Sequence, residues 1–340
     1  MERPIREEGD PYGTHRSLEP KGSLPQPARR LDNDFSRLFR GEMLVEVETL
    51  NVDAASFRQM GLAGDVGGKV LETVKARGKQ HNPVTGSGGM LLGRVAQLAP
   101  GRPTESVKVG DRIASLISLS LTPLRIDGVR EVRAASAQLD VRGEAVLFAS
   151  SPYAKMPSDF SDRVALAALD VAGAAPQVAR LVSPGMTVVV LGAGGKSGTL
   201  CCVEAKRRGA HVIGVESHLP SAIELDEIGV CSTIVTTDAR DPIAVRHAVG
   251  TEADVVFSCV NVSDVEMSAI LCARDRGTVY FFSMTTSFTG AALGAEGVGK
   301  DVSLVIGNGF AHGHADHTLD LLRQFPVLLA LFERRYGGSS

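Results

Sequence analysis

Apolar and polar residues alternate in the first half of the chain, over short stretches separated by glycine and proline. Residues 44–50 alternate with a period of two, which is typical of a strand with one buried face. Residues 90–98 and 112–119 are apolar enough for further strands, with turn-forming residues 100–103 between them. Short strands and turns repeated in this way predict a small β-rich domain that resembles a barrel.

A different pattern begins near residue 162. Two alanine-rich stretches, 164–169 and 174–181, are typical of helices, and Pro184 follows the second. Helical stretches then alternate with apolar strands at 188–191, 210–215, 234–237, 254–260, 278–283 and 302–306. This βαβα order predicts a parallel sheet with helices on both faces, and we expect an amphipathic helix over 315–332.

The strand at 188–191 runs directly into a glycine-rich turn and then into a helical stretch. Such a unit holds the pyrophosphate of a dinucleotide, because glycine lets the backbone approach the phosphates and a helix N-terminus attracts anions. The spacing is irregular, since Gly-x-Gly-x-x-Gly would need glycine at Ser197, and a P-loop would need glycine at Val190. The alternative is a turn that only packs helix on strand. The cofactor contacts expected here are Gly192, Gly194, Gly195, Lys196, Ser197 and Gly198.

The next strand, 210–215, ends at Glu216, which lies 24 positions after Gly192 (216 − 192). An acid near this spacing binds the hydroxyls of the adenosine ribose and repels a 2′-phosphate. NAD is therefore favoured over NADP. Ser217 and His218 could accept a 2′-phosphate if Glu216 turned away, so NADP stays possible.

Composition and charge narrow the class of protein. The 340 residues are 44% hydrophobic and 22% charged with a net charge of −3, as in an ordinary globular protein of two domains. We find no basic cluster, apolar leader or membrane-length apolar stretch, so we expect a cytoplasmic protein without nucleic-acid or membrane partners. The five cysteines include no Cys-x-x-Cys pair, which favours neither a disulfide framework nor zinc.

Four segments resemble, in order and spacing, the medium-chain dehydrogenases/reductases, and the resemblance covers about the whole chain. They are residues 41–47, 86–95, 109–113 and 184–195. The resemblance implies an α/β protein with a GroES-like β-rich catalytic domain over 1–160 and a doubly wound Rossmann domain over 161–310. It also implies that residues 311–340 pack near the cleft between the domains, and that the protein is a homodimer.

The zinc-binding branch of that family is not matched. Its Gly-His-Glu motif is replaced by Gly86-Ser-Gly-Gly, and the cysteines of its structural zinc site are absent, so we expect a reaction without metal. His312, His314 and His317 lie close together in the sequence. Only the last two would share a helix face, so we expect capping or surface positions, with a role near the nicotinamide left open.

Within the family, four segments resemble enzymes that deaminate a small diamino acid in bacterial lysine fermentation. They are residues 12–27, 49–57, 82–90 and 307–310. The resemblance implies oxidation of an amine-bearing carbon by NAD, with release of ammonia. Hydride leaves that carbon only when the amine is neutral, so a base must take its proton. The substrate's carboxylate and second ammonium call for a cation and an anion in the pocket.

The first domain holds candidates for each of these roles. The segment after Asn51 borders the nicotinamide in metal-free members of the family, which makes Asp53 and Ser56 the leading catalytic candidates. His15 and Glu19 are further candidates for a base or an ammonium partner. The cations that could bind the substrate carboxylate are Arg16, Lys21 and Arg58.

Each candidate also has a purely structural interpretation. Asp53 is equally suited to cap the short helix that follows it. Arg16 and Glu19 could pair with each other on the surface, where an ion pair contributes little. Lys21 is compatible with a turn lysine, and Arg58 with a solvated residue at the end of a short helix.

Polar residues follow the later strands of the predicted sheet. Asn261 ends one strand, and Ser283 and Thr285 end the next. Ligands of such sheets bind beyond the carboxyl ends of the strands, so these side chains should approach the cofactor. We expect the same of Asn308, near the nicotinamide.

Two other functions remain open from the sequence. One is metal-free reduction of a quinone or enone on the same scaffold, which normally uses NADPH; Glu216 and the charged N-terminal segment argue against it. The other is a non-catalytic dinucleotide-binding protein, and the presence of Asp53 and Glu19 weighs against that. Fold alone decides neither question.

Overall fold

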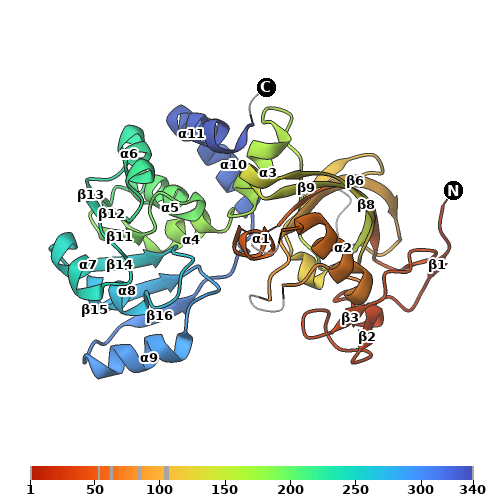
Figure 1. Ribbon diagram of the computed structural model, residues 1–340, viewed down its shortest axis with the longest axis horizontal. Coiled ribbons are helices and arrows are strands. Elements are labelled where there is room, and N and C mark those ends of the chain that lie inside the picture. Colours follow the sequence, from red (N-terminus) through yellow and green to blue (C-terminus); the bar gives the residue numbers. More distant parts are fainter. Residues whose placement is uncertain (1, 53, 62–63, 83–85, 103–106, 339–340) are drawn as a thin grey trace. The chain divides into compact units, whose positions relative to one another are not determined.

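The computed structural model describes residues 2–52, 54–61, 64–82, 86–102 and 107–338 (Figure 1). The chain forms two compact units. Residues Met1–Asp170 and Tyr336–Ser340 make up the first, and Val171–Arg335 the second. The sequence prediction placed the division after residue 160, whereas α3 (Asp162–Leu169) groups with the first unit. The predicted packing of residues 311–340 near a cleft stays a prediction.

The first unit is built on a six-stranded sheet in the order β10-β7-β6-β5-β9-β8, with antiparallel neighbours throughout. The strands are β5 (Met43–Asn51), β6 (Met90–Leu98), β7 (Arg112–Ser115), β8 (Leu124–Arg133), β9 (Gln138–Leu147) and β10 (Tyr153–Lys155). The central strand β5 is buried over most of its length, and its apolar side chains Val45, Val47 and Leu50 lie in the main core. The predicted strand 112–119 is shorter, because a 3-10 turn (Leu119–Leu121) replaces its end.

Two helices, α1 (Ala54–Gly61) and α2 (Val66–Arg77), connect β5 to β6. Asp65 caps α2, since its side chain accepts the N–H of Gly68 at 2.8 Å. The helix buries Val66, Val70 and Val74 on one face, which follows the four-residue spacing of a helix stripe. Gly78 ends it in the left-handed conformation, at φ 66°, where a Cβ would lie 2.1 Å from the Leu31 carbonyl oxygen.

The N-terminal residues form short elements beside this sheet. β1 (Ile5–Arg6) pairs with β4 (Leu38–Phe39), and β2 (Ser17–Glu19) pairs with β3 (Arg30–Leu31). A single 3-10 turn (Thr14–Arg16) precedes β2. The sequence prediction of extended, irregular structure over residues 1–30 is therefore confirmed in outline.

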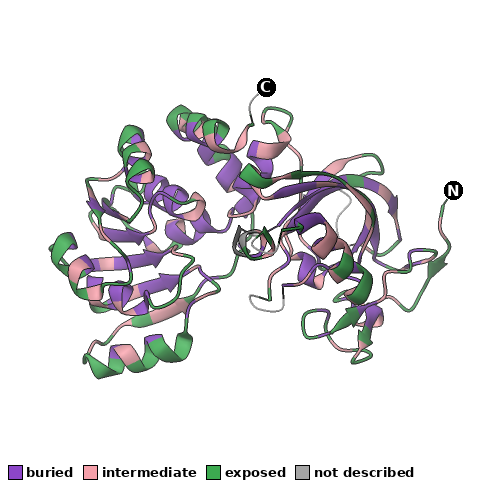
Figure 2. Ribbon diagram, in the orientation of Figure 1, coloured by how far each residue is buried: buried purple, intermediate pink, exposed green. Residues whose placement is uncertain are grey.

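The second unit contains a six-stranded parallel sheet in the order β13-β12-β11-β14-β15-β16. Its strands are β11 (Thr187–Leu191), β12 (His211–Glu216), β13 (Thr233–Thr236), β14 (Ala253–Ser258), β15 (Ala273–Phe281) and β16 (Ser303–Ile306). The chain order reverses between β11 and β14, which is the point where dinucleotides bind in doubly wound sheets. The strands in the middle of this sheet are buried, as the purple ribbon in Figure 2 shows. The predicted fold class is confirmed.

Helices cover both faces of this sheet (Figure 1). They are α4 (Ala174–Leu181), α5 (Lys196–Arg207) and α6 (Leu219–Ile228) on one side, and α7 (Pro242–Val249), α8 (Glu266–Cys272) and α9 (Phe288–Gly297) on the other. None of the helices in the described ranges is by itself long and apolar enough to cross a membrane.

The C-terminal part of the chain forms two helices, α10 (His314–Gln324) and α11 (Pro326–Tyr336). The prediction of one helix over 315–332 is therefore wrong. Pro326 has no N–H to continue the hydrogen bonds of α10, and proline is well suited to the first position of a new helix. The break consequently falls at Phe325.

Candidate active site

The glycine turn after β11 has the close backbone packing that a dinucleotide loop requires. Gly192 has φ 72°, a conformation that favours glycine. A Cβ at Gly198 would lie 2.0 Å from the Gly192 carbonyl oxygen, and one at Gly194 would lie 2.7 Å from the Ser221 Cβ. These positions cannot carry side chains without moving the loop. The glycine loop thus packs directly against the first helical turn of α5, as at a pyrophosphate site.

The N-terminus of α5 begins directly after this turn. Gly195 is its N-cap, and no side chain caps the helix there. The first backbone hydrogen bond of the helix runs from the Thr199 N–H to the Gly195 carbonyl oxygen at 2.9 Å. Lys196, Ser197 and Gly198 therefore occupy the first turn, where backbone N–H groups point toward an approaching anion. The residues present fit a dinucleotide cofactor.

Glu216 lies at the end of β12 and is bonded to the glycine turn itself. Its Oε2 accepts the backbone N–H of Gly194 at 3.0 Å, and its Oε1 accepts the backbone N–H of His218 at 2.9 Å. Each carboxylate oxygen has a second lone pair for a ligand hydroxyl. Glu216 is thus held beside the turn, where folds of this kind place the carboxylate that binds the ribose hydroxyls.

Arg335, near the end of α11, is a further contact of this turn, and no sequence pattern predicts it. Its Nη1 donates to the Gly194 carbonyl oxygen at 2.6 Å, and its Nε donates to Glu224 of α6 at 2.8 Å. Gly194 is therefore bonded through its N–H to Glu216 and through its carbonyl to Arg335. No local pattern links positions 194 and 335, so only the fold could reveal this contact.

The polar residues predicted near the cofactor gather at the carboxyl ends of β14 and β15. Ser283 Oγ lies 2.7 Å from Thr285 Oγ1, which in turn donates to the Val262 carbonyl oxygen at 3.2 Å. Asn261 is exposed at the end of β14. Asn308 lies after β16, where its Oδ1 accepts Gln177 Nε2 at 3.5 Å. Their contacts with a cofactor stay predictions.

In the first unit, Arg16 is a structural residue and its predicted contact with substrate is wrong. The side chain is 0% exposed. Its Nε and Nη2 donate to the two oxygens of Glu42, each at 2.8 Å. The remaining donors reach the Asp34 and Arg37 carbonyls and, at 3.4 Å, the Asp32 carboxylate. A guanidinium with its donors occupied in this way cannot also bind a substrate carboxylate. The suggested pairing of Arg16 with Glu19 is also wrong.

His15 belongs to the same buried cluster. Its Nδ1 accepts the backbone N–H of Asp10 at 3.0 Å, so its Nε2 carries the proton that bonds to Glu42 Oε1 at 2.8 Å. The ring also packs against Phe39 and Phe148. With both nitrogens bonded inside the protein, His15 is not available as a base, which corrects its predicted role.

Glu19 and Lys21 lie at the surface of the first unit. Glu19 pairs with Arg29, whose side chain is 76% exposed, so the pair resembles an ordinary surface ion pair. Lys21 is exposed and forms an isolated β-bridge with Leu18. The described contacts assign neither residue to a site, and their predicted roles stay predictions.

Of the leading catalytic candidates, Ser56 is 1% exposed and Asp53 lies outside the described residues. Ser56 Oγ accepts a hydrogen bond from Asn82 Nδ2 at 2.6 Å, and the same amide group donates to Gln59 Oε1 at 3.0 Å. The side chain of Arg58 also lies outside the description. Ser56 is therefore part of a polar network that joins α1 to Asn82.

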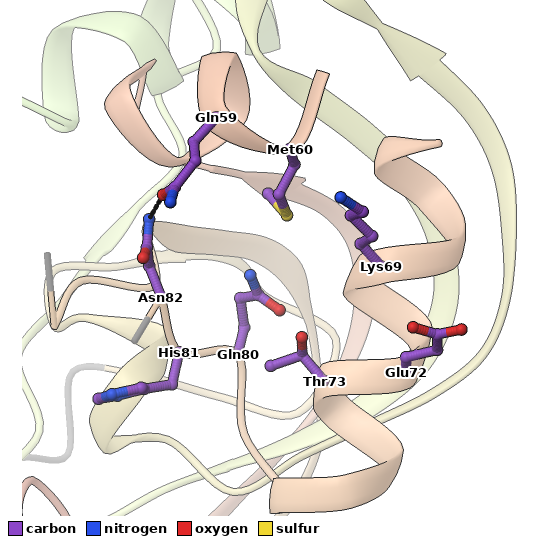
Figure 3. A pocket seen from close by; sticks show the side chains of 8 residues that line it. All are labelled: Gln59, Met60, Lys69, Glu72, Thr73, Gln80, His81 and Asn82. Atoms are coloured by element: carbon purple, nitrogen blue, oxygen red, sulfur yellow. Dashed lines mark hydrogen bonds between the residues drawn. The ribbon is translucent and has the colours of Figure 1, made fainter. Parts of the chain in front are cut away.

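A pocket of about 240 Å³ opens beside this network (Figure 3). It is lined by Gln59, Met60, Lys69, Glu72, Thr73, Gln80, His81 and Asn82. Sequence reasoning did not predict these residues as a site. Asn82 begins one of the segments that carry the resemblance, but only the fold brings α1, α2 and residues 80–82 together. Burial, with Lys79 and Arg77 nearby, lowers the pKa of His81 below its usual value, so the ring is neutral at neutral pH.

The three C-terminal histidines do not converge. His312 packs against Phe310, His314 Nδ1 lies 2.6 Å from the Ala311 carbonyl oxygen, and His317 Nε2 lies 3.3 Å from Glu204. Among the described residues, no group of three or more His, Cys, Asp or Glu side chains could hold a metal ion.

Solved structures of low sequence identity share this fold. A quinone oxidoreductase from Coxiella burnetii aligns with a TM-score of 0.55 at 18% identity, over 84% of this chain and 79% of that one. A mycobacterial protein complexed with NADPH has the same TM-score and identity, over 84% and 80%. At this identity the likeness establishes the class of fold alone: a β-rich unit and a unit with a doubly wound parallel sheet that carries a glycine turn at its switch point.

Sequence comparison narrows this class. The profile described as the L-erythro-3,5-diaminohexanoate dehydrogenase N-terminal domain matches residues 15–157. L-erythro-3,5-diaminohexanoate dehydrogenase of Acetoanaerobium sticklandii is 49% identical over 96% of this chain and 99% of its own length. The enzyme of that name from Fusobacterium nucleatum subsp. nucleatum is 47% identical over 96% and 99%. The chain belongs to the L-erythro-3,5-diaminohexanoate dehydrogenase family, and it is a dehydrogenase.

Proposed function

We propose that this chain catalyses the NAD-dependent oxidative deamination of (3S,5S)-3,5-diaminohexanoate. The products are (S)-5-amino-3-oxohexanoate, ammonium, NADH and a proton, and one water is consumed. The observation that carries the proposal is the identity of 49% and 47% to two enzymes named for this substrate, over nearly the full length of each.

The residues of the chain supply a dinucleotide site of the required kind. When bound, NAD supplies the acceptor for the hydride that leaves carbon 3. The glycine turn and the N-terminus of α5 would hold its pyrophosphate, and Glu216 its adenosine ribose. The chain must also remove a proton from the 3-ammonium, and Asp53 remains our candidate for that step.

Glu216 is the reason to prefer NAD over NADP. Its carboxylate is held by the N–H groups of Gly194 and His218, so turning away would break two hydrogen bonds. A 2′-phosphate beside this fixed negative charge would be repelled. These contacts argue against the alternative in which Ser217 and His218 accept the phosphate.

The competing functions have less support. Quinone oxidoreductases share the fold at 18% identity, a level that carries no statement about substrate. A non-catalytic dinucleotide-binding protein would not need a polar pocket beside Ser56. We further propose that the enzyme is a cytoplasmic homodimer that acts in bacterial lysine degradation, as the family resemblance implies.

The test is to incubate the protein with the diamino acid and either NAD or NADP, and to measure reduced cofactor and ammonia together. We expect one ammonia for each NADH, with NAD much preferred, and no loss of rate in the presence of a chelator. NADH formation without ammonia, or turnover only of enones with NADPH, would refute the proposal.

A further inference from the structure

The pocket beside Ser56 has walls of different character. Gln59 and Met60 come from α1, Lys69 and Thr73 from α2, and Gln80 from the segment that follows α2. Figure 3 shows the ends of Met60, Lys69 and Gln80 directed toward the same space. A volume of about 240 Å³ admits a small organic molecule such as a six-carbon amino acid.

Gln80 places a hydrogen-bond acceptor, its amide oxygen, in a buried position. The residue is 2% exposed, and its Oε1 has no hydrogen-bond partner among the described residues. A buried acceptor left unsatisfied loses its hydrogen bonds to water without replacement, so such groups in native proteins call for an explanation. A ligand that donates a hydrogen bond into the pocket would supply the missing partner.

Lys69 provides a positive charge. Its side chain is half-buried at the pocket wall, and within the described part of the chain it forms no ion pair. An ammonium in this position attracts a carboxylate, which can accept hydrogen bonds from it. The Thr73 hydroxyl, on the next turn of α2, is a second polar group on the same wall. The pocket thus offers a cation on one wall and the unpaired amide oxygen of Gln80 on another, with Glu72 as the acid among its lining residues.

We propose that this pocket binds the diamino acid substrate, with Lys69 on its carboxylate and Gln80 Oε1 on its 5-ammonium. The inference rests on the proposed function and adds to it the residues that select a substrate with a second amino group. Met60 contacts the carbon chain. Asn82, which lines the pocket and bonds to Ser56 at 2.6 Å, connects the bound substrate to the segment where the catalytic candidates lie.

This assignment predicts that a monoamino acid binds more weakly than the diamino acid. It would leave Gln80 Oε1 buried and unpaired, as in the empty pocket, whereas the diamino acid supplies a charged donor. A hydrogen bond to a charged group contributes about 1.5–3 kcal/mol, which corresponds to roughly 10- to 150-fold in affinity. Selection by a lost hydrogen bond is stronger than selection by shape alone.

The test uses Gln80→Met, which keeps the length of the side chain and removes the acceptor. Binding of 3,5-diaminohexanoate and of 3-aminohexanoate to the NADH-loaded protein is measured by calorimetry. We expect Gln80→Met to weaken the diamino acid by roughly 10- to 150-fold and to leave the monoamino acid and NADH unchanged. Equal effects on both acids, or no effect on either, would overturn the assignment.

Lys69→Met tests the other wall, with Lys75→Met as its matched control. Both lysines lie on α2, but Lys75 is exposed and does not line the pocket. We expect Lys69→Met to weaken both acids, because both carry the carboxylate, and Lys75→Met to weaken neither. If the unaltered protein binds and deaminates the diamino acid but all three variants behave like it, only the pocket assignment fails. If the unaltered protein does not bind the diamino acid, the proposed function fails with it.

Discussion

Glu216 accepts the backbone N–H of Gly194 at 3.0 Å, so the acid that would select the cofactor is bonded to the turn that would hold its phosphates. The two residues are 22 positions apart, Gly194 in the turn after β11 and Glu216 at the end of β12. Removing the side chain of Glu216 therefore affects both the charge facing the ribose and the anchoring of Gly194. Substitutions that separate these two effects are the most informative.

Glu216→Gln removes the charge and keeps an oxygen that can accept from Gly194. We expect the preference for NAD over NADP to fall by roughly tenfold or more, because repulsion of the 2′-phosphate is lost. The dissociation constants of both cofactors, measured by fluorescence titration, test this. Glu227→Gln is the control, since Glu227 pairs with Arg334 on the exposed side of α6. An unchanged preference in Glu216→Gln would show that the acid does not face the cofactor.

Gly198→Ala should damage the loop itself. The new methyl group would lie 2.0 Å from the Gly192 carbonyl oxygen, and that contact involves backbone, which moves only with the loop. We expect loss of measurable NAD binding and a decrease in unfolding free energy of about 1–3 kcal/mol. Gly297→Ala is the matched control, because nothing lies within 4 Å of its Cβ position. Thermal unfolding with and without NAD distinguishes the two variants, and equal behaviour would contradict the loop geometry.

Glu42→Gln should destabilise the first unit strongly. It leaves the buried guanidinium of Arg16 with only the more distant Asp32 carboxylate, at 3.4 Å, and breaking a buried pair costs about 3–5 kcal/mol in unfolding free energy. Glu19→Gln, at an exposed pair with Arg29, should cost no more than about 1 kcal/mol. Denaturant titration of both variants measures the difference. Comparable losses would mean that the buried Arg16–Glu42 pair contributes no more to the free energy of unfolding than an exposed pair does.

The same pair predicts a loss of stability in acid. Burial raises the pKa of Glu42, but hydrogen bonds from Arg16 and His15 outweigh it, so the pKa lies below its usual 4.5. A carboxyl whose pKa is lower in the folded protein stabilises the fold at pH values above its pKa in the unfolded chain. This contribution is lost as the pH falls through the pKa of the folded state. The free energy of unfolding should therefore decrease as the pH is lowered past about 4.5, and it should decrease less in Glu42→Gln.

Lys79 predicts a second window, at alkaline pH, in which stability rises with pH. The side chain is 0% exposed, and its Nζ donates to the Pro25 carbonyl oxygen at 2.8 Å. Burial, with Arg77 nearby, lowers its pKa from 10.5 to about 8. The unfolded chain therefore binds more protons between these two values, and stability should rise with pH across that window. In Lys79→Met this rise should disappear, whereas Lys75→Met, at an exposed position of α2, should keep it.

The sequence predicted the second unit better than the first. The strand, glycine turn, helix and acid from Thr187 to Glu216 form a local unit, so periodicity and spacing identify them directly. The break between α10 and α11 was missed because the amphipathic pattern continues across Pro326. Local pattern is thus a good guide where neighbouring residues in the chain are also neighbours in space.

The candidate site in the first unit depends on contacts between distant segments. The sequence predicts a substrate cation at Arg16, because nothing near it in the chain indicates its partner, Glu42, which lies 26 residues away. Gln80 and Lys69 were overlooked for the same reason, since only the packing of α1 and α2 forms their pocket. Charge and hydrogen-bonding capacity are visible in a sequence, but whether they are already satisfied is not.

The most direct test of the central proposal is the fate of the hydrogen on carbon 3 of the substrate. 3,5-Diaminohexanoate deuterated at that carbon is incubated with the protein and NAD, and the reduced cofactor is analysed by mass spectrometry. We expect one deuterium in the reduced nicotinamide and release of the 3-amino group as ammonia. Deuterium that remains in the amino acid product while NADH forms would show oxidation at another position and would contradict the proposed reaction.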